Sequence, residues 1–235
     1  MKLNTNSNTY ILAYASLLVI AVAFVLAYFS QALKPIQDKN VALDKKKQII
    51  AALNIRDVND NQVEEYYNKL VEADEIINEK NEVLSAGKPG GENDGFKLNG
   101  GDFKAGKLAL FVCNVDGQKK YVMPVYGMGL WGGISGYIAI NADKETIYGV
   151  YFNHEGETAG LGAEIKDNQK WQQQFCGKHL FADGNQDAVA LSVSKKVDNP
   201  ATQVDGVSGA TLTCDGVTRM IHEGLGKYLV FLKDK

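Results

Sequence analysis

The chain has 235 residues, a formal net charge of −3 and a pI near 5.7. It has no basic excess and no basic run with interleaved aromatic residues, so the composition excludes a typical nucleic-acid-binding protein. No CxxC pair or Cys/His cluster is present, so neither a structural zinc nor a protein-ligated iron–sulfur cluster is expected. We expect buried thiols at the three cysteines, with one disulfide and one free thiol as the alternative: Cys113, Cys176 and Cys214.

A membrane anchor is predicted close to the N-terminus, after a tail of residues 1–10. Residues 11–29 (ILAYASLLVIAVAFVLAYF) contain no charge, glycine or proline, and they are long enough to cross a hydrocarbon core of about 30 Å. Aromatic residues lie at both ends of this stretch, as in membrane proteins. A cleaved signal peptide is the alternative, but its apolar core is shorter and a small-residue cleavage site follows it. We therefore predict an uncleaved transmembrane helix.

The charges around this helix bear on its orientation. Lys2 is the one lysine before it, whereas five lysines follow it within residues 30–47. Counted alone, this bias places the large domain in the cytoplasm.

Residues 30–80 are predicted to form a juxtamembrane helical segment. Apolar residues at helical spacing indicate one helix over residues 41–55 and a second over 61–78, with a break at 57–60. Residues 81–103 are rich in glycine, asparagine, lysine and aspartate, and we expect a flexible loop there.

Residues 104–235 are predicted to form the main domain. From Leu108 the spacing of the apolar residues changes to that of strands, with a hairpin turn at Asp116-Gly117. These strands are expected over 108–115, 120–126, 136–140, 146–153 and 188–193. A short helix over 168–175, a loop over 195–203 and a long C-terminal helix complete the pattern. The order of elements favours an α+β fold with a mixed or antiparallel sheet and flanking helices.

The first glycine-rich loop is residues 127–136 (GMGLWGGISG). Its glycines leave the backbone open to close approach, and Trp131 offers a planar apolar face to a ligand. The alternative is a wide connection in which Trp131 fills the core. Residues 127–132 fit GxGxxG, but no helix pattern follows, so a dinucleotide site is not favoured.

The second glycine-rich loop is residues 153–165 (NHEGETAGLGAEI). Thr158 and the free N–H groups beside it are suited to a ring with carbonyl and nitrogen acceptors, and Leu161 could pack on such a ring. A plain connection is the alternative. A metal site at His154, Glu155 and Glu157 is not favoured, because these residues have no helical i,i+4 spacing.

The third motif, residues 205–213 (DGVSGATLT), directly precedes the C-terminal helix pattern. Small residues allow close approach, and two threonine hydroxyls lie where the helix begins. A helix N-terminus favours phosphate, because its first N–H groups are unpaired and carry partial positive charge. A simple helix cap is the alternative.

Together with the anchor and the juxtamembrane LDKKKQI (residues 43–49), the GLW (129–131), ETxGLG (157–162) and DxxSGAT (205–211) motifs resemble the C subunit of the bacterial Na+-translocating NADH:quinone oxidoreductase. The G subunit of the Rnf complex belongs to a related family. The resemblance implies FMN esterified through its phosphate to Thr211 by a flavin transferase, with Thr213 as the fallback. It implies further cofactor-binding residues at Trp131, Glu157, Thr158, Leu161, Gly162, Asp205, Ser208, Gly209, Ala210 and Leu212.

By this resemblance the chain is an inner-membrane electron-transfer subunit that works with other subunits of a redox complex, between NADH and ubiquinone or menaquinone. We expect no catalytic acid, base or metal of its own, because the flavin carries the chemistry. The resemblance also implies an extracytoplasmic, periplasmic domain, against the lysine count, and we follow the resemblance. The alternatives are the Rnf-type G subunit and a non-redox anchored binding or scaffold protein.

Overall fold

The computed structural model describes residues 5 and 7–234, and it divides into residues 1–44 and residues 45–235. Five residues of the predicted tail, 1–4 and 6, lie outside the described residues. Helix α1 (Asn8–Ala52) contains the whole predicted transmembrane stretch, and its most apolar window is unburied. Within the described part of the chain, α1 is the one helix long and apolar enough to cross a membrane.

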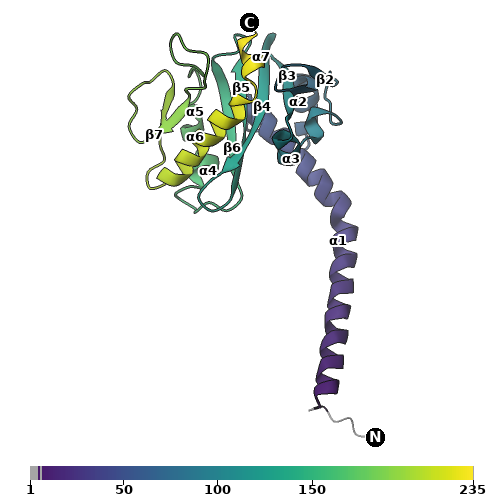
Figure 1. Ribbon diagram of the computed structural model, residues 1–235. Coiled ribbons are helices and arrows are strands. Elements are labelled where there is room, and N and C mark those ends of the chain that lie inside the picture. The colour runs from purple at the N-terminus through teal and green to yellow at the C-terminus, as the bar shows by residue number, and fades with distance from the viewer. Residues whose placement is uncertain (1–4, 6, 235) are drawn as a thin grey trace. The chain divides into compact units, whose positions relative to one another are not determined.

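The unit from residue 45 onward is built on a six-stranded antiparallel sheet in the order β2-β1-β3-β4-β5-β6 (Figure 1). Its strands are β1 (Val71–Asn78), β2 (Val83–Ser85), β3 (Lys107–Val115), β4 (Gln118–Met128), β5 (Gly133–Asn141) and β6 (Ile147–His154). A separate parallel pair joins β7 (Ser192–Ser194) to β8 (Gln203–Asp205). The predicted α+β class with a mixed or antiparallel sheet is confirmed.

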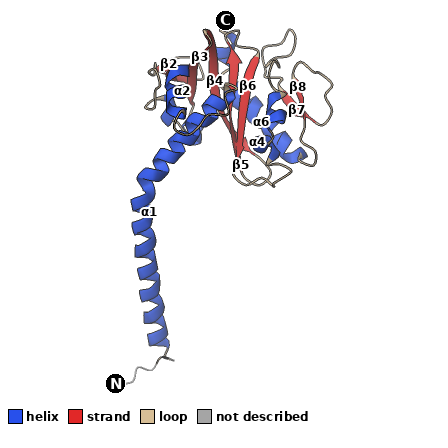
Figure 2. Cartoon of the chain, turned by 180° about the vertical axis from the view of Figure 1, so that it is seen from behind, coloured by secondary structure: helices blue, strands red, loops and turns tan. Residues whose placement is uncertain are grey.

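The remaining elements are short except for one. They are α2 (Val63–Leu70), the 3-10 turn η1 (Gly95–Lys97), α3 (Gly100–Lys104), α4 (Glu164–Asp167), α5 (Gln169–Gln173), α6 (Thr211–Gly226) and α7 (Leu229–Lys233). Helix α6 packs against β4, β5 and β7, and α4 and α5 pack against β6. Figure 2 shows α6 beside the main sheet, with β7 and β8 next to it. The predicted C-terminal helix is therefore the element that joins the two sheets.

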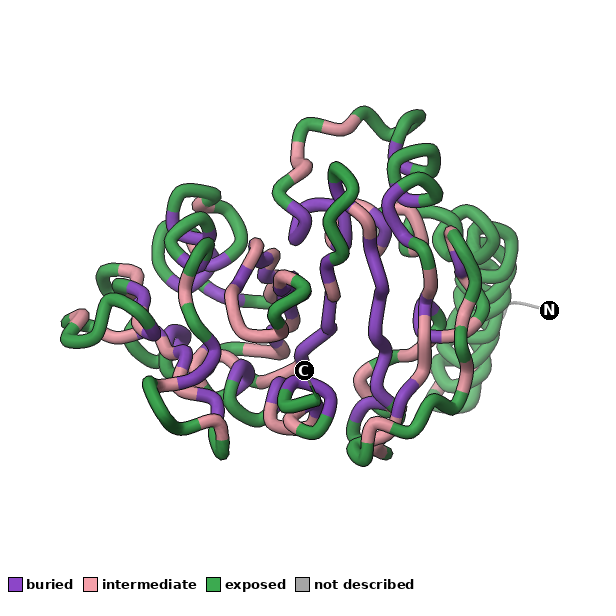
Figure 3. The backbone as a smooth tube through the Cα atoms, turned by 90° about the horizontal axis from the view of Figure 1, so that it is seen from above, coloured by how far each residue is buried: buried purple, intermediate pink, exposed green. Residues whose placement is uncertain are grey.

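Both faces of the main sheet are covered, because successive side chains of a strand point to opposite faces. On β3, Leu108 and Leu110 belong to the core cluster that contains Met220 and Ile221 of α6. Phe111 of the same strand faces the other way and packs edge-on against Tyr137 of β5. Figure 3 shows that the central strands are buried along most of their length. The burial of both faces fixes the position of α6 against the sheet.

Several predicted elements are corrected by the structure. The helix predicted over 61–78 ends at Leu70, and β1 follows at once. The apolar residues around the junction of α2 and β1 fit both a helical and a strand period. Residues 71–78 form a strand because β1 pairs with β3 along its length. The strand predicted over 188–193 is reduced to β7, the predicted loop over 81–103 contains β2, η1 and α3, and β8 begins within the loop predicted over 195–203. Cys113 and Cys214 are buried free thiols as expected, but Cys176 is exposed.

The segment after β2 is held by a buried carboxylate. Asp74 of β1 is fully buried, and its carboxylate accepts hydrogen bonds from the backbone N–H groups of Lys88, Asp94 and Phe96 at 3.0–3.3 Å. Three N–H donors replace the water that the charge loses on burial. Asp74 thus fixes a segment that has little regular structure of its own.

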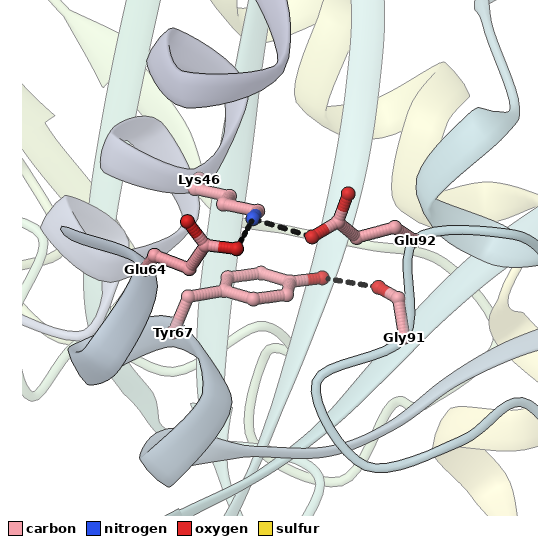
Figure 4. A network of polar contacts seen from close by, with 5 residues as sticks. All are labelled: Lys46, Glu64, Tyr67, Gly91 and Glu92. Carbon is pink, nitrogen blue, oxygen red and sulfur yellow. Dashed lines mark hydrogen bonds and ion pairs between the residues drawn. The ribbon is translucent and has the colours of Figure 1, made fainter. Parts of the chain in front are cut away.

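A second polar network lies beside this segment (Figure 4). The ammonium of Lys46, buried near the end of α1, pairs with Glu92 and, at 3.7 Å, with Glu64 of α2. The buried Tyr67 hydroxyl donates to the Gly91 carbonyl at 2.9 Å. The last turns of α1, helix α2 and the segment after β2 therefore form one packed corner.

We predict that Asp74→Ala strongly destabilises the domain, because three backbone N–H groups lose their carboxylate acceptor. The expected cost is about 3 kcal/mol, which corresponds to a thermal midpoint about 6–12 °C lower for a domain of this size. The measurement is thermal unfolding of the detergent-solubilised full chain. Glu72→Ala removes an exposed carboxylate from the same strand and serves as the control. Equal midpoints for the two variants would contradict the role given to Asp74.

Candidate functional site

The third motif opens α6 as the sequence predicts. Ala210 is the N-cap residue, its carbonyl accepts from Cys214 N at 2.9 Å, and no side chain caps the helix. The first N–H groups of α6 therefore have no side-chain acceptor at the cap. This leaves an N-terminus with partial positive charge at the surface, which suits an anion.

The two threonines at this N-terminus have different surroundings. Thr211 is the first helical residue, and it is exposed. Thr213 is only 1% exposed, and its hydroxyl donates to the Glu157 carboxylate at 2.6 Å. The Thr213 hydroxyl is thus occupied inside the protein, whereas the Thr211 side chain is accessible from outside.

Glu157 joins the three motifs at one point. Its side chain is buried, with 7% exposed, and one carboxylate oxygen accepts from Thr213 of α6. The other oxygen accepts from the backbone N–H of Trp131 at 2.9 Å. A single carboxylate therefore ties the Trp131 loop and the loop after β6 to the first turn of α6.

The protonation of Glu157 follows from these contacts. Desolvation by burial raises the pKa of its carboxyl, but the hydrogen bonds from Thr213, Trp131 and Leu130 and the nearby His154 together lower it below its ordinary value. The carboxylate is therefore ionised at neutral pH, the form that accepts from several donors. His154 also holds the backbone at Glu157, because its Nδ1 accepts a hydrogen bond from the Glu157 backbone N–H at 3.2 Å.

Two glycines make this junction sterically feasible. A Cβ atom on Gly162 would lie 2.5 Å from Glu157 Oε2 and 2.6 Å from Thr213 Oγ1, closer than side chains tolerate. A Cβ atom on Gly209 would lie 2.8 Å from Cδ2 of Leu161. Leu161 therefore packs directly beside the turn that precedes Thr211.

Large apolar side chains surround the start of α6 but remain exposed. Trp131 is 69% exposed, so it does not fill the core, and the alternative interpretation of this loop is excluded. The other members of this group, which we call the apolar rim together with Trp131, are Met128, Leu130, Leu161 and Leu212. These side chains give the start of α6 an exposed apolar character.

The remaining predicted residues lie around the same place. Ser208 and Thr158 are exposed, and the Thr158 carbonyl accepts from Leu161 N and Ala163 N, which closes the turn of the second loop. The backbone carbonyl of Asp205 accepts from the Trp171 ring nitrogen at 2.8 Å. Asp205, Ser208, Gly209 and Thr211 line a cleft of about 650 Å³. Among the described residues no three His, Cys, Asp or Glu side chains are grouped as a metal site.

Sequence patterns do not reveal every residue of this region. Lys195 and Asp215 also line the cleft beside Thr211, and Met128 and Leu130 belong to the apolar rim. Lys195 falls in a stretch expected to be a plain loop, where a lone lysine gives no signal. Leu130 adjoins Trp131 in a glycine-rich loop, and an apolar pair in such a loop could have been read as a surface for a ligand.

The motifs and the fold define a flavin-binding domain, and comparison with known proteins agrees. Residues 129–226, which contain all three motifs, match the FMN-binding domain family. The chain is 31% identical to the C subunit of the Na(+)-translocating NADH-quinone reductase of Haemophilus ducreyi, over 99% of this chain and 97% of that protein. The corresponding C subunit of Pseudomonas aeruginosa is 29% identical over 95% and 94%.

Solved structures show the same relationship. The crystal structure of the C subunit from Parabacteroides distasonis matches with a TM-score of 0.78 and 36% identity, over 86% of this chain and 98% of that one. Shewanella oneidensis NqrC matches with a TM-score of 0.65 and 27% identity, over 83% and 100%. The chain belongs to the family of Na+-translocating NADH-quinone reductase C subunits.

We predict that Glu157→Gln removes a pH-dependent part of the stability. Because the folded pKa of Glu157 lies below the ordinary value of about 4.3, its contribution is fully present above that value and is lost as pH falls through the folded pKa. The difference in thermal midpoint between wild type and variant should be largest above pH 5 and should shrink toward pH 3. Glu155→Gln, at an exposed neighbour, is the control. A difference that stays constant with pH would refute the ionised, hydrogen-bonded Glu157.

Proposed function

We propose that this chain is the membrane-anchored, electron-carrying C subunit of a Na+-translocating NADH-quinone reductase and that it holds FMN through a phosphoester to Thr211. The observation that carries the attachment site is the contrast between the two threonines of α6. Thr211 is exposed at an uncapped helix N-terminus, whereas the Thr213 hydroxyl is buried against Glu157. A phosphate on Thr211 would lie where the helix favours negative charge.

The residues around Thr211 fit a flavin. When bound, FMN supplies one- and two-electron redox chemistry, which the protein side chains lack. Trp131, Leu161 and Leu212 of the apolar rim offer surfaces on which an aromatic ring can pack, and Thr158 offers a hydroxyl at its edge. Glu157 positions the two loops from within, because its oxygens already accept from Thr213 and Trp131.

Attachment requires an activated donor and a separate enzyme. Condensation of a free phosphate with a hydroxyl in water is unfavourable, so the FMN phosphate has to come from a phosphoanhydride such as that of a flavin dinucleotide. A bond then forms between Thr211 Oγ and phosphorus, the anhydride bond breaks, the adenylate leaves and the hydroxyl proton is released. A flavin transferase supplies the base for this step.

The same evidence bears on the alternatives. An anchored scaffold protein does not account for the match to the FMN-binding domain family. The relatives that match along nearly the whole chain are named as C subunits of the NADH-quinone reductase, which favours this complex over an Rnf-type one. Its partners are the other subunits of that complex.

We further propose a single span in the inner membrane, with the domain in the periplasm. Three of the five lysines that oppose this orientation have partners in the unit from residue 45 onward. Lys45 donates to the Phe96 and Leu98 carbonyls, Lys46 pairs with Glu92, and Lys47 pairs with Asp60. These lysines stabilise the fold, which accounts for their presence without a cytoplasmic location.

We predict that Thr211→Ala abolishes covalent flavin and that Thr213→Ala retains it at a reduced level. The full chain is expressed with a flavin transferase, and the fluorescent band is followed on a denaturing gel. Thr211→Ser restores a hydroxyl and should restore part of the fluorescence. If Thr211→Ala keeps the fluorescence and Thr213→Ala loses it, the attachment site is wrong.

We predict that protease added to spheroplasts cleaves the domain. In spheroplasts the outer envelope is opened and the cytoplasmic membrane stays intact. The chain is detected by an antibody to its C-terminal part. Protease added after detergent lysis shows that the domain can be cleaved at all. A domain that is protected in spheroplasts and cleaved after lysis would overturn the periplasmic assignment.

A further inference from the structure

The cleft beside Thr211 contains an unusual set of charges. It lies between the end of β7, the turn 206–209 and the first turns of α6, and its volume is about 650 Å³. The ionisable residues among those that line it, apart from Cys214, are Lys195, Asp205 and Asp215. Lys195 is therefore its one cation, set against two carboxylates.

The backbone just before Lys195 is fixed to α6. Val193 of β7 donates its N–H to the Thr218 hydroxyl at 3.0 Å, and the same hydroxyl lies 3.3 Å from the Val193 carbonyl. The His222 ring nitrogen Nε2 lies 2.9 Å from the Leu191 carbonyl. Both partners on α6 lie on the helix that Thr211 begins. Hydrogen bonds thus fix the strand that precedes Lys195 to the helix that begins at Thr211.

A further bond ties the same strand to the flavin motif. The N–H of Gly206 donates to the Ser194 carbonyl at 2.9 Å, so the residue before Lys195 is linked to the turn before Thr211. Figure 2 shows β7 and β8 side by side next to α6. Lys195 therefore directly follows a strand that is hydrogen-bonded both to α6 and to the turn before Thr211.

The charges that line the cleft indicate what Lys195 could do there. Burial, with the carboxylates of Asp215 and Asp205, raises the pKa of the Cys214 thiol against an opposing hydrogen bond from Val207, so the thiol is neutral. A phosphodiester on Thr211 would add a third negative charge beside the two carboxylates. A cation in the same cleft offsets that repulsion.

We propose that Lys195 is a positioning residue for the flavin phosphate: its ammonium pairs with the phosphate oxygens on Thr211 and offsets the charges of Asp205 and Asp215. This rests on the proposed attachment of FMN to Thr211. Lys196, the next residue, does not line the cleft, and its ammonium pairs with Asp198 at 3.2 Å. The chain therefore supplies its own matched control.

The test measures how fast the full chain takes up covalent flavin from a flavin dinucleotide and a purified transferase. Lys195→Met should slow the initial rate about two- to fivefold, in keeping with the modest strength of exposed ion pairs, and Lys195→Arg should restore it. Lys196→Met should match wild type. Raising the salt concentration from about 0.05 to about 0.5 M should shrink the difference, because salt screens exposed charges.

A second variant and a spectroscopic signature guard against a merely structural effect. Asp215→Asn, which removes one of the opposing charges, should raise the rate in the wild-type chain and restore part of it in Lys195→Met. In the flavinylated chain, the phosphorus-31 resonance should shift in Lys195→Met and stay in place in Lys196→Met. A structural defect alone would produce neither the rescue nor the salt dependence.

The outcomes separate this inference from the function on which it rests. If the wild-type chain takes up no covalent flavin, or takes it up on another residue, the proposed attachment fails and the role of Lys195 fails with it. If the wild-type chain is flavinylated on Thr211 but Lys195→Met and Lys196→Met match it in rate and in phosphorus resonance, the role of Lys195 alone is overturned.

Discussion

The candidate site depends on one buried carboxylate. Glu157 accepts from the Trp131 backbone and from the Thr213 hydroxyl, and so joins two glycine-rich loops to the first turn of α6. Burial of a carboxylate is costly unless hydrogen bonds replace its hydration, and here the donors come from the segments to be joined. Gly162 leaves room for the contact. The Glu157 carboxylate thus both stabilises this junction and sets the geometry of the site.

This junction also determines what is left exposed. With Thr213 turned inward, Thr211 occupies the outer side of an uncapped helix start. Glu157 holds the backbone of Trp131, whose ring lies at the surface with the rest of the apolar rim. Exposed apolar side chains carry a cost in water, and a bound flavin ring would cover them. A carrier that exchanges electrons with neighbouring subunits needs its cofactor at such an accessible edge.

Much of the fold follows from the sequence pattern because its signals are local. The apolar runs of β3, β4, β5 and β6 predict strands of a mixed or antiparallel sheet, and Asp116-Gly117, with φ of 52° and 79°, forms the turn between β3 and β4. The helix predicted over 61–78 fails beyond Leu70, because pairing of β1 with β3 is a tertiary effect that a periodicity cannot detect. The short strands β2 and β8 escape prediction for the same reason.

The site is predictable in its motifs but not in its details. The residue types at 129–131, 157–162 and 205–213 bring attention to three separate loops, and the fold places them together. Which threonine is free, whether Trp131 is exposed, and that Glu157 lies beneath the loops are all set by contacts between distant segments. The sequence pattern does not single out Lys195, because its place in the cleft depends on how β7 packs against α6.

The attachment of FMN to Thr211 is tested most directly by tandem mass spectrometry of the chain purified from its native membranes. The peptide that contains residues 208–213 is fragmented, and the residue that carries the added mass is located. We predict the mass of FMN, less one water, on Thr211. The same mass on Ser208 or Thr213, or an unmodified peptide in a complex that contains its flavins, would contradict the attachment.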